Sequence, residues 1–424
     1  MEGGPLAWAF FRVAAAGRAL VPRRRRELPS APRRIAVVRL GGVGDAVLAT
    51  PILGPLRERY PGASLEVVCW RAAEGVFRGN PVVHRVLSSP LLDARTPRDL
   101  ARSLRFREWV RLRGFFRGVD LVIFLVRTCS VAGFLKAALV AHWARKAVRV
   151  GIDTGGRAHY LDLRVEEGGG AAQHEVGGVA SVLKALGAPI RSDALSLSVP
   201  VSSGDRERAG ELLGPLTGRP FAALHLGSSQ EGWRGLKRFG LELWEAVARG
   251  LHDRYGLSMV LLGSHEDRQA NFALARALAS GRAGPIPVVD LSGRTALMEV
   301  VAVVERARLF VGTDSGVAHL AACAPTPGIA LFAFTDFVRM APWSQNAKVM
   351  VPPLACAPCQ YTLGYERCEN RCCFDLDPEE VLRTAGELLA GGEEKAWGAR
   401  SGATGCSAGG SPRAAVTPAG RRSC

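Results

Sequence analysis

The sequence predicts an α/β protein made of two Rossmann-like domains, each with a parallel β-sheet. Strand-like and helix-like segments alternate from residue 33 to 200, and the alternation restarts at residue 219 after a polar, turn-rich stretch. This alternation is typical of parallel sheets that are covered by helices on both faces. The chain has 424 residues, of which 48% are hydrophobic and 22% charged, so two apolar cores can form.

The first domain is expected to span residues 33–200. Its apolar runs have the length of buried strands, and the segments between them have the apolar spacing of helices. The expected strands cover residues 33–40, 64–70 and 119–126, and the expected helices cover 46–60, 132–144 and 174–187.

The second domain is expected to span residues 219–376, after a linker with one polar helix over 201–218. It repeats the pattern of the first domain. The expected strands cover residues 221–227, 258–264, 287–293, 308–314 and 328–334, and the expected helices cover 241–256, 268–281, 296–307 and 316–324.

The two ends of the chain differ from this body. Residues 1–32 are basic and have an amphipathic pattern. Residues 377–391 predict a helix that Asp377 caps and Gly391 ends. Residues 392–424 have low complexity and are expected to be disordered.

The net charge of +16 is concentrated at these ends, since residues 1–34 contribute +6 and residues 395–424 contribute +5. The remaining body is only mildly basic, which does not indicate nucleic acid and fits an acidic small substrate or an anionic membrane surface. The N-terminal charges follow the apolar stretch, the reverse of a secretory signal peptide, so a cytoplasmic location is expected. The basic tail either lies on the inner membrane surface or is a disordered extension.

A glycine-rich turn follows the first expected strand, and an aspartate comes directly after it. The stretch contains Gly42, Gly44 and Asp45, and it lacks the third glycine of a dinucleotide-binding motif. Open α/β sheets bind ligands at the carboxyl ends of their strands, where Asp45 is expected to lie. Asp45 can accept a proton from an attacking hydroxyl there, or it can cap a helix that begins at Ala46.

A second glycine-containing turn ends the expected strand over 308–314. Asp314, Ser315 and Gly316 open a helix there, and His319 follows one turn later. Free backbone N–H groups at a helix start bind anions, so a phosphate is expected to contact Ser315 and Gly316, with His319 as a further donor. The alternative is a structural helix with a capped start and a buried histidine.

A third candidate loop follows the strand over 221–227. Ser228 and Ser229 come directly after this strand, and Lys237 lies shortly before the next expected helix. Lys237 is placed to neutralise a diphosphate, and the alternative is a solvated basic loop.

Five of the ten cysteines fall within residues 356–373. A Cys-x-x-Cys pair followed by further cysteines is compatible with a structural zinc site, and free thiols are the alternative. The candidate ligands are Cys356, Cys359, Cys368 and Cys372, with Cys373 as a substitute for the last.

Taken in order, these segments resemble glycosyltransferase family 9, the ADP-heptose:lipopolysaccharide heptosyltransferases. The resemblance covers residues 33–390 and depends on five stretches: "IAVVRLGGVGDAVLATPILGPLRERYPGASLEVV", "GNPVVHRVL", "HEVGGVASVLKALG", "LHLGSS" with "LKRF", and "VGTDSGVAHLAACAPTP". The chain departs from the family at "FLVRTCS", which contains Phe124 and Arg127 in place of a short polar turn, and at "QEGWRG" before Lys237.

The resemblance implies a GT-B fold, with the acceptor bound by the first domain and a nucleotide-sugar mainly by the second. It implies that Asp45 is the general base, in a loop with Gly42 and Gly44, and that Lys237 stabilises the leaving diphosphate. It assigns the donor site to the residues Ser228, Ser229, Glu266, Asp314, Ser315, Gly316 and His319.

The expected function is therefore metal-independent, inverting transfer of a heptose or a similar sugar. The donor would be ADP-heptose and the acceptor a lipopolysaccharide-type glycolipid at the inner membrane surface. No cofactor is required by this chemistry, and the structural zinc considered above would be separate from it. The alternatives are another GT-B enzyme, such as a nucleotide-sugar epimerase, and a catalytically silent nucleotide-binding protein.

Overall fold

The chain divides into two compact units, Met1–Pro200 and Val201–Cys424, which we describe separately. The structure is a computed structural model. It describes residues 26–94, 96, 98–99, 106–127, 130–166, 174–188, 190, 192–228, 237–280, 284–352, 358 and 376–400, with side chains in the last helix up to Gly391.

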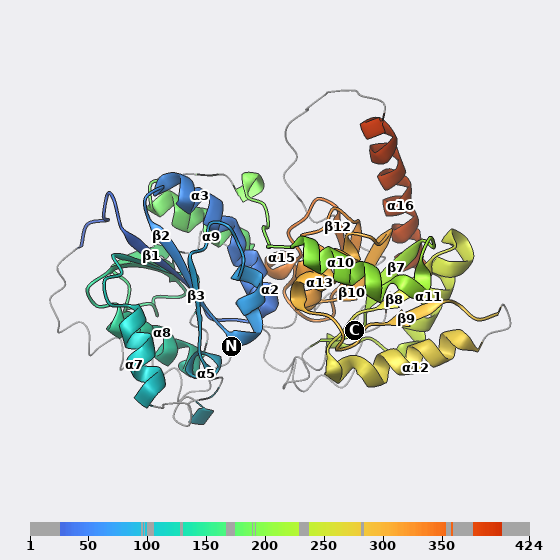
Figure 1. The fold of residues 1–424 in the computed structure, drawn as a ribbon, viewed down its shortest axis with the longest axis horizontal. Helices are drawn as coiled ribbons and strands as arrows, with labels where there is room; N and C mark the ends of the chain where they lie inside the picture. The colour runs from blue at the N-terminus through green and yellow to red at the C-terminus, as the bar shows by residue number, and fades with distance from the viewer. Residues whose placement is uncertain are drawn as a thin grey trace. The chain divides into compact units, whose positions relative to one another are not determined.

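The first unit is built on a parallel sheet of six strands in the order β3-β2-β1-β4-β5-β6 (Figure 1). The strands are β1 (Arg34–Arg39), β2 (Ser64–Cys69), β3 (Arg85–Ser88), β4 (Leu121–Phe124), β5 (Val148–Asp153) and β6 (Leu163–Glu166). This is the Rossmann strand order. Strands are added outward from β1 in one direction and then from β4 in the other, so the order reverses between β1 and β4, and we call this place the reversal point of the sheet. Ile35 pairs with Leu65 on one side and with Leu121 on the other.

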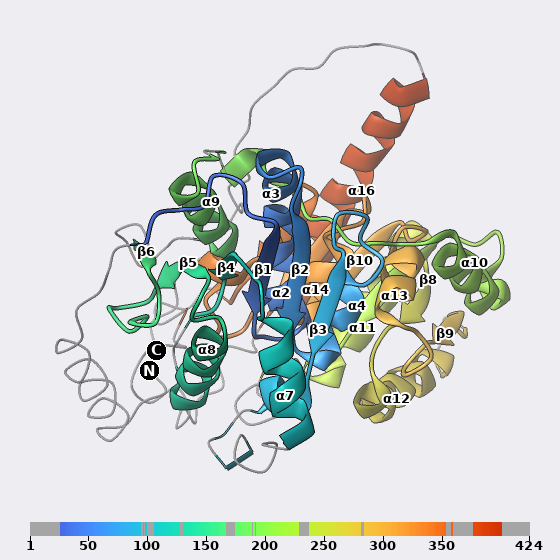
Figure 2. The same ribbon diagram turned by 60° about the vertical axis from the view of Figure 1, so that its left-hand side comes forward.

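Helices cover both faces of this sheet, with α7 and α8 on one face and α2, α3 and α9 on the other (Figures 1 and 2). The helices are α2 (Val43–Ala49), α3 (Leu53–Arg59), α4 (Glu74–Phe77), α5 (Pro90–Asp93), α7 (Phe106–Phe115), α8 (Val131–Trp143) and α9 (Glu175–Ala185), with short 3-10 turns η1 (Thr50–Ile52), η2 (Arg71–Ala73) and η3 (Ser192–Ala194). Val38 and Phe124 pack on the face that α7 and α8 cover. The strands are continuous runs of buried apolar residues because helices cover both faces of the sheet.

The second unit repeats this plan with six parallel strands in the order β12-β11-β10-β7-β8-β9. The strands are β7 (Phe221–His225), β8 (Ser258–Leu261), β9 (Val288–Asp290), β10 (Leu309–Thr313), β11 (Gly328–Leu331) and β12 (Ala347–Met350). Read from the other edge, the order is again that of a Rossmann sheet, with its reversal between β7 and β10. The predicted α/β class with two Rossmann-like parallel sheets is confirmed.

In the second unit, α11, α12 and α16 pack on one face of the sheet, whereas α10, α13 and α14 cover the other (Figures 1 and 2). The helices are α10 (Ser203–Leu212), α11 (Leu241–Tyr255), α12 (Arg268–Ala279), α13 (Leu297–Val304), α14 (Gly316–Ala321), α15 (Phe337–Met340) and α16 (Pro378–Arg400), with 3-10 turns η4 (Gly214–Leu216) and η6 (His265–Asp267). Trp244 of α11 is the largest fully buried side chain and anchors the first of these faces.

Several helix boundaries differ from the sequence-based expectation, and two of these differences have a clear local cause. Helix α2 begins at Val43 rather than at Ala46, because Gly42 in an extended conformation starts the helix. Helix α16 continues past Gly391 to Arg400. A glycine inside a helix costs only about 1 kcal/mol, and the good helix formers that follow in "EEKAW" offset that cost.

Among the described residues, no helix combines the length and the apolar character that crossing a bilayer would require. The basic stretch over residues 1–25, on which the membrane-surface prediction for the N-terminal tail mainly depends, lies outside the described residues.

Candidate functional site

The first candidate site lies where β1 ends and α2 begins, at the reversal point of the first sheet. Asp45 occupies the third position of α2, and its Oδ2 accepts a hydrogen bond of 2.9 Å from the Gly42 amide. Its side chain is nevertheless 36% exposed. Asp45 therefore caps the helix and also presents a carboxylate to solvent, so the two sequence-based interpretations are compatible.

Glycine is required at Gly41 because the backbone passes very close to this carboxylate. A Cβ atom at position 41 would lie 2.5 Å from Oδ2 of Asp45. Gly42 provides the amide donor, and Gly44 lies inside the first turn of α2. The predicted loop residues thus shape the surroundings of Asp45.

A buried arginine, Arg39, holds the second oxygen of this carboxylate. Its Nη2 lies 2.6 Å from Oδ1 of Asp45 and 3.3 Å from Oε2 of Glu175. The other oxygen of Glu175 lies 2.6 Å from Nε of Arg127. Four charged side chains therefore form a chain of alternating sign, from Asp45 through Arg39 and Glu175 to Arg127.

Arg39 is a fixed positive charge in this chain. Its side chain is only 7% exposed, and it also donates to the carbonyl oxygens of Asp45 and Leu125. Burial opposes the charged form, but the nearby carboxylates of Asp45 and Glu175 outweigh it and raise the pKa of Arg39. Arg39 and Glu175 were not among the site residues expected from the sequence. The signal available was a charged residue at the end of a buried strand and another in the first turn of a helix.

The second candidate site lies at the reversal point of the second sheet, between β7 and β10. Nζ of Lys237 lies 2.5 Å from Oδ2 of Asp314, which directly follows β10. The hydroxyl of Thr335 donates a hydrogen bond of 2.6 Å to the same oxygen. The predicted residues Lys237 and Asp314 are therefore brought together across 77 positions, and Thr335 is a partner that was not expected from the sequence.

Ser315 caps α14, with its Oγ accepting a bond of 3.4 Å from the Ala318 amide. Ser315 and Gly316 are partly exposed, as the predicted anion site requires. His319 is only 2% exposed, so its side chain lies in the interior and does not share the accessible surface of Ser315 and Gly316. Its role as a donor to a phosphate stays a prediction.

A second network surrounds Ser228 and Glu266 through the buried carboxylate of Asp267. Asp267 accepts hydrogen bonds from the amide and hydroxyl of Ser264 and from Nη2 of Arg238. Nη2 of Arg238 also donates to the Ser228 carbonyl at 2.9 Å. Glu266, one residue before Asp267, is exposed in η6.

Two glycines permit this network. A Cβ atom would lie 2.3 Å from the Asp267 carboxylate at Gly227 and 2.7 Å from the Asp267 side chain at Gly263. The turns after β7 and β8 therefore converge on one buried carboxylate, which keeps Ser228 and Glu266 at the carboxyl edge of the sheet.

His225 ends β7 and is buried beneath these loops. Its Nδ1 lies 3.1 Å from the Leu262 carbonyl, so this nitrogen carries the proton in the neutral ring. Burial lowers the pKa of His225, and the opposing hydrogen bonds and the Asp267 charge do not compensate. His225 is therefore a neutral structural residue that joins β7 to β8.

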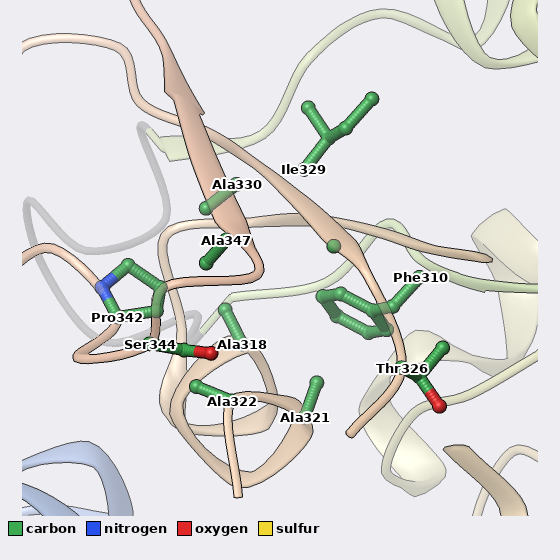
Figure 3. A pocket seen from close by; sticks show the side chains of 11 residues that line it. Phe310, Ala318, Ala321, Ala322, Thr326, Ile329, Ala330, Pro342, Ser344 and Ala347 are labelled. Carbon is green, nitrogen blue, oxygen red and sulfur yellow. The ribbon is translucent and has the colours of Figure 1, made fainter. Parts of the chain in front are cut away.

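A separate small pocket lies between α14 and the edge of the second sheet (Figure 3). Five of its eleven lining residues are alanine, Phe310 and Ile329 add larger apolar side chains, and Thr326 and Ser344 supply the polar ones. None of its lining residues is charged, so it does not suit a diphosphate.

Some predicted site residues lie outside the described residues. These are Ser229 and the cysteines Cys356, Cys359, Cys368, Cys372 and Cys373. The described part of the chain contains no group of three or more His, Cys, Asp or Glu side chains that could hold a metal ion. The zinc prediction for the cysteine cluster remains a prediction.

Comparison with known proteins adds a family match. The model of the family described as glycosyltransferase family 9 (heptosyltransferase) matches residues 127–368. Lipopolysaccharide heptosyltransferase 3 of Escherichia coli is 26% identical over 72% of this chain and 84% of its own length. Lipopolysaccharide heptosyltransferase 1 of Pseudomonas aeruginosa is 25% identical over 82% of this chain and 93% of its own.

Solved structures share the fold. The structure titled E. coli ADP-heptose lps heptosyltransferase II aligns with a TM-score of 0.65 at 21% identity, over 85% of this chain and 99% of that one. E. coli heptosyltransferase WaaC with ADP aligns with a TM-score of 0.57 at 19% identity, over 84% of this chain and 99% of that one. With the two Rossmann-like sheets, this similarity confirms the predicted GT-B fold class.

Proposed function

The chain belongs to glycosyltransferase family 9, and from this premise we propose that it transfers a heptose from ADP-heptose to a lipopolysaccharide-type glycolipid, with inversion at the anomeric carbon. The observation that carries the proposal is a shared position: each Rossmann sheet holds a charged pair at its reversal point. The pair is Arg39 with Asp45 in the first unit and Lys237 with Asp314 in the second. The reversal point is where open α/β sheets bind ligands.

Asp45 would act as the general base. Arg39 and the Gly42 amide each occupy one lone-pair direction of its carboxylate, and an ionised carboxylate has about four such directions. Its exposed part can therefore still accept the proton of an acceptor hydroxyl, whose oxygen then attacks the anomeric carbon. Held at both oxygens, the carboxylate needs little reorganisation during the reaction.

The second unit would stabilise the leaving ADP. As the sugar–oxygen bond breaks, negative charge grows on the diphosphate, and Lys237 and the amides at Ser315 and Gly316 are the candidate donors. An ammonium group has three donors, so Lys237 can keep Asp314 as a partner while it binds a phosphate oxygen. Charge stabilisation by these groups requires no bound metal in the proposed reaction.

The acceptor and the location follow from the same proposal. The related proteins are named as lipopolysaccharide heptosyltransferases, which supports a glycolipid acceptor for this chain. Such an acceptor is held in a membrane, so we propose that the protein acts at the cytoplasmic face of the inner membrane. Glu266 is then the candidate contact for the donor ribose, because it is exposed at the carboxyl edge of the second sheet.

The test measures transfer from a panel of nucleotide sugars to a heptose-deficient glycolipid, for the wild type and for Asp45→Asn. Asparagine still caps α2 through its carbonyl oxygen but cannot take up a proton, so we expect kcat to fall by about 10²–10⁴. ADP release that depends on the acceptor identifies transfer, whereas interconversion of free nucleotide sugars would identify an epimerase.

Asp205→Asn is the matched control. Asp205 is also the third residue of a helix, α10, and its carboxylate bonds the Ser202 amide at 2.8 Å in the same way. This variant should keep full activity. Equal activity of Asp45→Asn and Asp205→Asn would exclude Asp45 as the base, and the absence of transfer with every donor would contradict the proposed function.

A further inference from the structure

Helix α7 presents an apolar pair of side chains to solvent. Leu112 and Phe115 form its buried face against the first sheet. Phe106 and Val110, one turn apart on the opposite side, are 79% and 47% exposed. Within the described residues four large hydrophobic side chains are exposed, and two of them are this pair.

The same surface is strongly basic. Arg107, Arg111 and Arg113 are exposed on α7, and the exposed Arg117 follows two residues after the helix ends. The single acidic residue of the helix, Glu108, accepts a bond of 2.8 Å from the Ser89 hydroxyl and lies 3.5 Å from Arg111. The exposed side of α7 therefore carries net positive charge.

This combination favours one class of partner. Exposed apolar side chains gain free energy when they enter the boundary between headgroups and acyl chains, and arginines gain from anionic headgroups. A nucleic acid would use the arginines but gains little from the aliphatic Val110, since bases stack on aromatic rings. The surface thus fits an anionic lipid bilayer better than a polyanion in solution.

We propose that α7 is a docking surface for anionic phospholipid bilayers. Phe106 and Val110 enter the bilayer boundary, and Arg107 and Arg113 contact the lipid phosphates. Arg113 lies 5.2 Å from the ring centroid of Trp109, so the indole holds one guanidinium beside the apolar pair. The inference concerns membrane binding alone and does not depend on the transfer chemistry.

The experiment is co-sedimentation of the full chain with phosphatidylcholine vesicles and with vesicles of equimolar phosphatidylcholine and phosphatidylglycerol. The wild type should bind the anionic vesicles and not the neutral ones. Phe106→Ser with Val110→Ser should weaken binding at least about tenfold, because burial of each side chain is lost. Arg107→Gln with Arg113→Gln should weaken it about 25-fold, since each arginine near an anionic surface contributes a factor of about five.

Phe272→Ser is the matched control. Phe272 of α12 is 61% exposed and has Arg276 at 6.0 Å from its ring, but no second exposed apolar side chain accompanies it on α12 among the described residues. This variant should bind like the wild type. Thermal unfolding of each variant verifies that the first unit is folded.

Two outcomes would overturn the inference: wild-type binding that does not depend on phosphatidylglycerol, or a folded Phe106→Ser, Val110→Ser variant that binds like the wild type. Transfer to a detergent-dispersed acceptor separates this failure from failure of the proposed function. All α7 variants should keep wild-type rates in that assay, because none of the substituted residues belongs to the proposed catalytic groups.

Discussion

At the scale of single residues, the second candidate site depends on an ion pair that is largely withdrawn from water. The Lys237 side chain is 15% exposed, and Asp314 and the Thr335 that donates to it are both buried. Removal of one partner from such a pair leaves a buried charge without compensation, which costs more than the pair itself contributes.

Lys237→Met should therefore destabilise the second unit by about 2–3 kcal/mol, whereas Lys237→Met combined with Asp314→Asn should recover about half of that loss. The double variant removes the uncompensated carboxylate that the single variant leaves behind. Urea unfolding, followed by amide hydrogen exchange in β7 and β10, measures both values. A single variant as stable as the wild type would mean that water already compensates Asp314.

Residues of the predicted sites could be identified from the sequence where they lie close together in the chain. Gly42 and Asp45 are three positions apart, and Ser315 and Gly316 begin one helix, so local turn chemistry indicates them. Arg39 and Glu175 are 136 positions apart, and their pairing depends on how α9 packs against α2 and β5. Local pattern contains no information on such a contact, and for the same reason Thr335 was missed.

At the scale of elements, β7 contains a buried titratable side chain, His225, that makes folding stability depend on pH. His225 is neutral in the folded state because burial lowers its pKa. The unfolded chain takes up a proton at this position as the pH falls below the ordinary value of 6.5, and the folded chain does so only at a lower pH. Stability is therefore highest above that pH and decreases as the pH falls.

His225→Gln should make the stability of the second unit less dependent on pH between 7 and 5. The lost contribution is at most about 1.4 kcal/mol per pH unit, the value for one proton. Urea midpoints at both pH values, for wild type and variant, measure the difference between the two slopes. Identical slopes for the wild type and the variant would contradict a buried, neutral His225.

Most strands were predicted, including the short edge strand β9, but β3, β5, β6 and β12 were not. The expected strands over 64–70 and 119–126 correspond to β2 and β4, which are buried in the sheet. The edge strands β3 and β12 have four residues each, too few for a clear period. The start of α2 was misplaced because the extended conformation of Gly42 cannot be read from local propensity.

At the scale of the whole molecule, the chain contains the same sheet order twice, and the two copies carry different chemistry. The partly exposed carboxylate of Asp45 lies at the first reversal point. The cation of Lys237 lies at the second, beside the capped start of α14. The fold therefore determines where ligands bind, and the loop residues determine which unit suits an anion.

ADP should accordingly stabilise the second unit in particular. At a free concentration of about 100 times Kd, a ligand that binds only the folded state adds about 2.7 kcal/mol to the free energy of unfolding. Hydrogen exchange of the full chain should show the strongest protection in segments 225–228, 264–267 and 314–319. AMP, which lacks the second phosphate, should protect these segments less at the same concentration.

Lys237→Met is the variant that connects this protection to the diphosphate. It should lose most of the difference between ADP and AMP, because the ammonium group that would bind the second phosphate is absent. Strongest protection around Gly42 and Asp45, or equal protection by ADP and AMP in the wild type, would place the diphosphate elsewhere. Loss of the difference in a folded Lys237→Met chain would instead link the cation at the second reversal point directly to the leaving group of the proposed reaction.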